Sequence, residues 1–234
     1  MAAQVSRAGR SAPQEQAGTP SHHCSFLHLS AGTTNPIMPD APSGSMDLNR
    51  LPILPLGDPG LRKQSIPVRD PADPAVKADA YRLLGVFRAF RNAYGYGAGI
   101  AAPQIGLLRR IIIIDQDTGP LIMVNPEVLP LHDRQTCFWE SCMCFPDLMV
   151  MTRRAAEIAV NYRSLDGKMS AIREISPDTA AVIRHEVDHL DGILHVDRAV
   201  DSRGIISRKA YGKDPAYFSR LCQEWNRPGL SGGG

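Results

Sequence analysis

The chain has 234 residues, of which 43% are hydrophobic and 21% charged, as is usual for a globular protein. A formal net charge of +2 creates no large field of one sign, so the charge indicates neither a nucleic-acid binder nor a membrane-surface binder. Apolar runs such as 111–114 are far shorter than the roughly 20 residues that cross a bilayer. We therefore expect no nucleic-acid specificity and no membrane span.

The five cysteines are an odd number at low density, which favours a reducing compartment and predicts a cytoplasmic protein. Arg7 and Arg10 lie near the N-terminus, but the apolar stretch of a secretory signal does not follow them. An organellar transit peptide stays an alternative, because this region is rich in serine and poor in acids. Residues 1–45 are rich in Pro, Gly and Ser without an apolar period, which predicts a disordered extension.

The first predicted element follows an extended, turn-rich stretch at 51–62. Asp73 is a suitable N-cap, Pro74 is favoured at the first helical position, and Gly95 is a typical end signal, so 74–94 is predicted to be a helix. Its expected packing face consists of Val76, Ala80, Leu83, Leu84, Phe87, Phe90 and Tyr94.

Short β-branched runs at 111–114 and 121–124 predict two strands. Residues 156–162 alternate in polarity and lead into an Asp-Gly pair at 166–167, which is a hairpin signal. We expect the second strand of this hairpin to end near residue 175.

The second predicted helix begins after the cap Ser176, with Pro177 in its first turn, and ends at Gly192. Short strands with a capped helix predict an α+β fold, in which antiparallel strands pack around this central helix. We expect one catalytic domain at 46–212, followed by a C-terminal helix and tail at 213–234.

The second helix carries the pattern of a metal site. His185 and His189 lie one turn apart on one face, so both imidazoles can reach a single ion, while Glu186 lies beside it. A polar helix face with this spacing by coincidence is the alternative, but it would place imidazoles among apolar neighbours without a reason. Hydrolytic metal sites use three protein ligands and keep one position for water, so a third ligand is needed.

Two completions of this set are open. Read forward, the histidine pair with Gly192 and His195 matches the string of metzincin proteases, in which His195 would be the third ligand. That family needs a methionine downstream, whereas the last methionine here is Met169; His195 is alternatively a residue just past the helix end. Read backward, Cys142 offers a thiolate from a short extended segment.

Three motifs together resemble the peptide deformylase family. They are GAGIAAPQIG at 97–106, ESCMC at 140–144 and HEVDHLDG at 185–192, in the order and with the spacing of that family. The similarity extends from about 51 to 200 and includes GDPGLR at 57–62. The resemblance implies a metal-dependent hydrolase that removes the formyl group from formyl-methionyl nascent peptides at the ribosome and releases formate.

The resemblance also implies a metal site. Cys142, His185 and His189 would bind one divalent ion, usually Fe²⁺ in this family, with Zn²⁺ or Ni²⁺ able to take the same ligands. The ligand types alone do not separate iron from zinc.

The resemblance further implies the catalytic groups. Glu186 would take a proton from the water that attacks the formyl carbon and deliver it to the leaving amine. The side-chain amide of Gln104 and the backbone N–H of Met143 would stabilise the charge on the formyl oxygen.

Gly97 and Gly99 lack a Cβ, so their strand can approach an extended peptide closely and offer main-chain hydrogen bonds. Side chains nearby are expected to surround the methionine side chain, although ordinary core packing is an equal alternative for them. These expected walls are Ala98, Ile100, Phe145 and Val182.

Deformylases pair the glutamate of the middle motif with an arginine, which here implies a pair of Glu140 and Arg154. If buried, this pair would brace the segment of Cys142, and loss of one partner would leave an uncompensated charge. A surface pair with no such role is the alternative.

The sequence departs from the family at several positions. Ser141 replaces a glycine, Cys144 a serine and Arg184 a glutamine, and Leu148 and Met149 lie where bacterial enzymes often carry an arginine. A degenerate paralogue that binds metal without turnover is therefore the alternative function. Cys144 is not expected to be a fourth ligand, because a Cys2His2 set is typical of closed structural zinc sites.

Overall fold

The computed structural model describes residues 51–227, so the predicted extension at 1–45 lies outside the described residues. The helices are α1 (Pro74–Tyr94), α2 (Pro177–Leu190), α3 (Arg208–Lys213) and α4 (Pro215–Trp225). The strands are β1 (Gly99–Ala101), β2 (Ile111–Ile114), β3 (Leu121–Pro130), β4 (Gln135–Cys142), β5 (Phe145–Ala155), β6 (Ile158–Arg163), β7 (Met169–Ile172) and β8 (Ile205–Ser207). Short 3-10 turns lie at Pro59–Arg62, Ala102–Ile105, His195–Arg198 and Ser202–Gly204.

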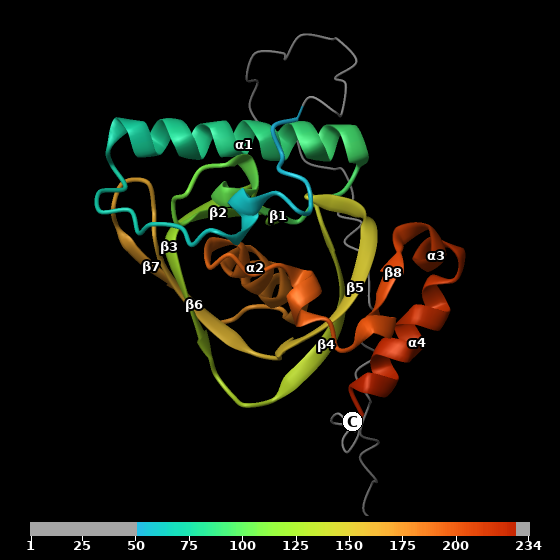
Figure 1. Ribbon diagram of the computed structural model, residues 1–234. Helices are drawn as coiled ribbons and strands as arrows, with labels where there is room; N and C mark the ends of the chain where they lie inside the picture. Colours follow the sequence, from blue (N-terminus) through green and yellow to red (C-terminus); the bar gives the residue numbers. More distant parts are fainter. Residues whose placement is uncertain (1–50, 228–234) are drawn as a thin grey trace, which may run out of the picture.

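The strands form two antiparallel sheets with α2 between them, which confirms the predicted α+β class (Figure 1). The five-stranded sheet has the order β1-β2-β3-β6-β7, and the three-stranded sheet has the order β4-β5-β8. β1 and β4 are therefore edge strands. In the part of the chain that is described, no helix is long and apolar enough to cross a bilayer.

Side-chain alternation along β2 explains the layers. Ile111 and Ile113 join the cluster that packs under α1, whereas Ile112 and Ile114 join the cluster that packs on α2. All four residues are fully buried, because helices cover both faces of the sheet. α3 and α4 lie on the side of the three-stranded sheet that faces away from α2 (Figure 1).

Both predicted helices begin at the expected caps. The Asp73 side chain accepts a hydrogen bond from the backbone N–H of Ala75, and the Ser176 side chain accepts one from that of Thr179. Gly95 ends α1 in the left-handed conformation, with φ of 74°. Local sequence signals therefore predicted both ends of α1 and the start of α2, the helix that carries His185 and His189.

β3 continues past the predicted end at residue 124 to Pro130, across a bulge. Asn125 has φ of 49°, and its side chain is paired with both backbone groups of Val68. In the sequence, Asn125 and Pro126 indicate the end of a strand. In the structure, they lie within β3, where its pairing with β6 shifts register. The contact with Val68 is distant in sequence, so no local pattern indicated it.

The C-terminal helix predicted within 213–234 is present as α4. The expected boundary at 212 falls inside α3, and α4 packs on β4 through a shared apolar cluster. The hairpin predicted at 166–167 joins β6 to β7, although β7 ends at Ile172, before the expected residue 175.

Gly192, just after α2, is predicted to be intolerant of a side chain. Its φ is 72°, and a Cβ added there would lie 2.5 Å from the carbonyl oxygen of Arg62. Gly192→Ala should lower the free energy of unfolding by roughly 1–3 kcal/mol, measured by urea denaturation. Gly119→Ala is the control, since Gly119 also has a positive φ but its Cβ would meet nothing within 4 Å. Equal losses in both variants would contradict a role for the contact with Arg62.

Candidate active site

Three buried side chains converge where the end of β4 meets α2. Cys142, His185 and His189 each offer a ligand atom, and these atoms all lie within 4.8 Å of one another. Cys142 Sγ is 3.2 Å from His189 Nε2. Two such ligands of a tetrahedral ion lie roughly 3.5 Å apart, given metal distances of about 2.3 Å to sulfur and 2.0 Å to nitrogen. The donor set and its spacing therefore fit a metal ion.

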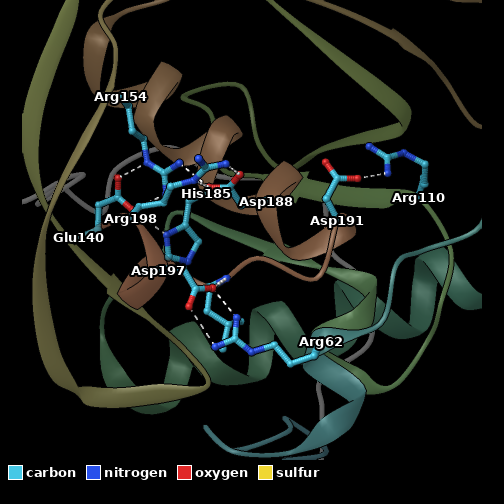
Figure 2. A network of polar contacts seen from close by, with 10 residues as sticks. Arg62, Arg110, Glu140, Arg154, His185, Asp188, Asp191, Asp197 and Arg198 are labelled. Carbon is cyan, nitrogen blue, oxygen red and sulfur yellow. Dashed lines mark hydrogen bonds and ion pairs between the residues drawn. The ribbon is translucent and has the colours of Figure 1, made fainter. Parts of the chain in front are cut away.

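Glu140 orients one of these imidazoles. Glu140 Oε2 lies 2.9 Å from His185 Nδ1, which leaves His185 Nε2 for an ion. The Glu140 carboxylate also accepts hydrogen bonds from Arg154 Nε at 2.5 Å and from Thr152 Oγ1 at 2.6 Å. The pairing of Glu140 with Arg154 that the resemblance implied is thus present and buried (Figure 2).

Burial alone would raise the pKa of Glu140, but the charge of Arg154 and hydrogen bonds from His185 and Arg154 hold it well below its usual range. Arg154 also donates from Nη1 to Asp188 at 2.6 Å, and Asp188 pairs with Arg198 at 2.9 Å. Figure 2 shows these charged side chains linked to one another next to His185. The charged part of this network thus alternates in sign from Glu140 to Arg198.

Sequence reasoning missed three members of this network, namely Thr152, Asp188 and Arg198. One signal existed for Asp188, which follows His185 by three residues and so shares its side of the helix. Thr152 and Arg198 carry no comparable local signal, because their partners are distant in sequence or lie across a turn.

Glu186 lies beside the three-residue cluster without belonging to it. Its side chain is buried, and its Oε2 atom has no hydrogen-bond partner among the described residues. Burial raises the pKa of Glu186 to about 7. A Cβ on Gly99 would lie 2.8 Å from Glu186 Oε1, so the missing side chain at Gly99 gives this carboxylate its space. Gly99 thus makes room for Glu186, and the close approach of this strand to a peptide stays a prediction.

The protonation of the ligands is sensitive to a bound cation. Burial raises the pKa of Cys142 well above its usual value, and a hydrogen bond with Cys144 adds to the shift. Burial and the neighbouring His185 hold the pKa of His189 well below its usual value, so this ring is neutral, as a metal ligand must be. Cation binding at the cluster is thereby coupled to the loss of the Cys142 proton.

Gln104 is buried beside the cluster. Its Oε1 atom accepts a hydrogen bond from the backbone N–H of Ala101 at 2.7 Å, which fixes the orientation of the amide. Its Nε2 atom donates toward Cys142 Sγ at 3.5 Å and Cys144 Sγ at 3.4 Å. Met143 lies in the turn between β4 and β5, directly after Cys142. Both predicted oxyanion donors therefore come from segments next to Cys142.

A cavity of about 790 Å³ opens beside the cluster, with the edge strands β1 and β4 contributing to its walls. Four of the predicted substrate residues line this cavity: Gly97, Ala98, Gly99 and Val182. The other two do not. Ile100 is fully buried in the cluster under α1, and Phe145 stacks on the His195 ring with centroids 4.6 Å apart. Ile100 and Phe145 thus lie in the packed interior and do not line the cavity.

The structure does not support the forward completion with His195. His195 lies in the 3-10 turn after α2, and the described residues that could hold an ion together do not include it. Its ring is 5.0 Å from that of His185 between centroids, and both of its nitrogens lack hydrogen-bond partners within 51–227. Among the described residues, Cys142 is the one whose ligand atom lies with those of His185 and His189.

Comparisons with known proteins give a consistent assignment. The family described as "Polypeptide deformylase" matches residues 50–204. A peptide deformylase of Thermotoga maritima is 34% identical over 154 residues, which cover 65% of this chain and 89% of the relative. A peptide deformylase of Dictyoglomus thermophilum is 36% identical over 146 residues, which cover 62% of this chain and 90% of the relative.

Solved structures agree with these relatives. The crystal structure of the Thermotoga maritima enzyme has a TM-score of 0.57 at 32% identity, covering 63% of this chain and 95% of that chain. A class I type b peptide deformylase from Acinetobacter baumannii, solved with Met-ala-ser bound, has a TM-score of 0.54 at 31% identity, covering 63% and 97%. The chain belongs to the peptide deformylase family, whose members are enzymes that remove the formyl group from peptides.

Proposed function

We propose that this chain removes the N-formyl group from formyl-methionyl peptides of nascent chains and releases formate, and that it acts in the cytoplasm, at the ribosome. The observation that carries this proposal is the buried carboxylate of Glu186, whose Oε2 atom has no hydrogen-bond partner within residues 51–227, beside the cluster of Cys142, His185 and His189. A general base without a competing partner, next to a three-ligand set in a cavity, suits hydrolysis of an amide.

Cys142, His185 and His189 would hold one divalent ion, and we propose Fe²⁺, with Zn²⁺ or Ni²⁺ as substitutes. The thiolate and imidazole donors accept all three ions, so the preference for iron rests on the family resemblance. A bound ion would supply Lewis-acid polarisation of the formyl group and would acidify a water molecule.

Glu186 would accept a proton at its carboxylate as water attacks the formyl carbon, and would then donate this proton to the leaving amine nitrogen. A pKa of about 7 suits both steps, because the group then changes protonation state readily near neutral pH. The cost of burying this carboxylate is consistent with such a role, since Oε2 has no structural partner among the described residues.

The substrate would bind as an extended strand along the free edge of β1. Gly97 and Gly99 border the cavity there, and a peptide added to a sheet edge gains main-chain hydrogen bonds. Val182, one turn before Glu186 on α2, would contact the methionine side chain. The Acinetobacter baumannii relative solved with Met-ala-ser supports a substrate that begins with methionine.

Gln104 and the backbone N–H of Met143 would stabilise the developing charge on the formyl oxygen. Gln104→Leu is expected to lower kcat by about 10²–10³-fold, because leucine is similar in size to glutamine but lacks the amide donor for the oxyanion. Metal content should stay unchanged. Steady-state formate release and metal analysis would measure both effects. Gln135→Leu, at the exposed start of β4, is the matched control. A change confined to KM would assign Gln104 to substrate binding instead.

The decisive test is formate release from formyl-Met-Ala-Ser by anaerobically purified protein of known metal content. Turnover that depends on the bound ion is the expected result. Metal-loaded protein that binds the peptide but releases no formate would instead identify a degenerate paralogue.

A further inference from the structure

The chain beyond residue 204, where the family match ends, builds an additional layer of the molecule. β8 pairs with β5, and α3 and α4 cover the outer face of the three-stranded sheet (Figure 1). The features shared with the family therefore do not account for this segment. Its position against β4 and β5 nevertheless brings it to the active-site cavity.

Tyr211 of α3 lines the same cavity as His185 and Glu186. Next to it, Trp139 of β4 also lines the cavity, and the two ring centroids are 5.8 Å apart. The indole Nε1 of Trp139 donates to the backbone carbonyl of Phe218 in α4 at 2.8 Å. Trp139 of β4 and Tyr211 of α3 thus form an aromatic wall, and α4 holds the Trp139 ring in place through the Phe218 carbonyl.

Arg208, the first residue of α3, connects this segment to both sides of the cavity. Its Nε atom donates to the carbonyl of Pro146 in β5 at 2.5 Å, and its guanidinium lies 4.3 Å from the ring centroid of Tyr96. Tyr96 borders the cavity just before the glycine strand. The C-terminal segment is therefore fastened to both walls.

Successive side chains of β4 point to opposite faces of the sheet, which shows which side of the strand this wall occupies. Phe138 lies near Arg184 of α2, whereas the next residue, Trp139, packs against α3 and α4. An extended peptide between the edges of β1 and β4 alternates in the same way. If its methionine side chain points toward Val182, the side chain of the following residue points toward Trp139 and Tyr211.

We infer that Trp139 and Tyr211 form a subsite for the residue that follows the formyl-methionine, and that this subsite selects an apolar side chain. The inference rests on the proposed deformylase function. The wall presents two aromatic rings with Met149 beside them, so a leucine side chain is buried favourably. A charged side chain would lose part of its hydration against these two rings.

The test compares formyl-Met-Leu-Ser with formyl-Met-Ala-Ser. The native enzyme should prefer the leucine peptide by about tenfold in kcat/KM, which is a moderate value for added methylene groups in a pocket. Tyr211→Ala should abolish most of this preference, whereas Tyr211→Phe should retain it. Tyr81→Ala, on the exposed face of α1, is the matched control and should keep the native preference. A preference unchanged in Tyr211→Ala would overturn the inference.

A binding measurement separates this inference from the proposed function. The unformylated peptides Met-Leu-Ser and Met-Ala-Ser are titrated into the native protein by calorimetry, with the same tenfold difference expected in Kd. Equal affinities would overturn the subsite whether or not the protein turns over. Absence of formate release would overturn the function alone. Because Tyr211 belongs to a buried cluster, Tyr211→Leu, which keeps more apolar volume, repeats the titration if the alanine variant unfolds.

Discussion

Glu186→Gln is expected to retain its metal and to lose about 10²–10⁴-fold in the rate of deformylation, the usual range for a general acid and base. The amide has the same shape as the carboxylate but cannot accept the proton. Glu186 is not one of the three clustered ligand residues, so metal content should not change. Formate release at matched metal content measures the loss.

The control for this variant is Glu157→Gln, because Glu157 is half exposed and pairs on the surface with Arg134. It should keep native activity. The Glu186 variant should also be at least as stable as the native protein in urea, since it removes an ionisable group that burial disfavours. Equal activity of the Glu186 variant and the native enzyme would show that the proton is transferred by another group.

The predictable part of the structure is local in sequence. Asp73 and Ser176 cap the two long helices as expected, and the spacing of His185 and His189 placed both imidazoles on one face of α2. Each of these features depends on interactions within a few residues. The choice of Cys142 over His195 as third ligand residue was not local, and only the resemblance in three separate motifs favoured it.

The features that the sequence did not reveal depend on contacts between distant segments. β4 and β5 carry Cys142 and Arg154, yet their length was not predicted, because their faces contact α2 on one side and α3 and α4 on the other. A strand buried on both faces loses the simple alternation of polar and apolar residues. The pairing of Arg154 with Asp188, 34 residues apart, was equally inaccessible to local reasoning.

The second large effect concerns the two cysteines around Met143. Cys142→Ser is expected to lose both metal and activity, whereas Cys144→Ser should keep the metal stoichiometry and most activity. Cys142 shares the cluster with His185 and His189, and Cys144 is not among the described residues that could hold the ion with them. Cys144 instead accepts a hydrogen bond from Gln104 at 3.4 Å, a contact that a serine hydroxyl can also make.

Cobalt substitution gives the sharpest measurement of this difference, because the absorption from thiolate to cobalt scales with the number of bound sulfurs. The native protein should show the intensity of one sulfur, and Cys144→Ser should leave it unaltered. Halving of the band in Cys144→Ser would mean two thiolates and two imidazoles around the ion, which is the closed set of structural zinc sites. Such a site would leave no open position for a reacting water, so Glu186 would have no bound water to deprotonate. The spectrum of one conservative variant therefore decides between an open hydrolytic site and a structural one.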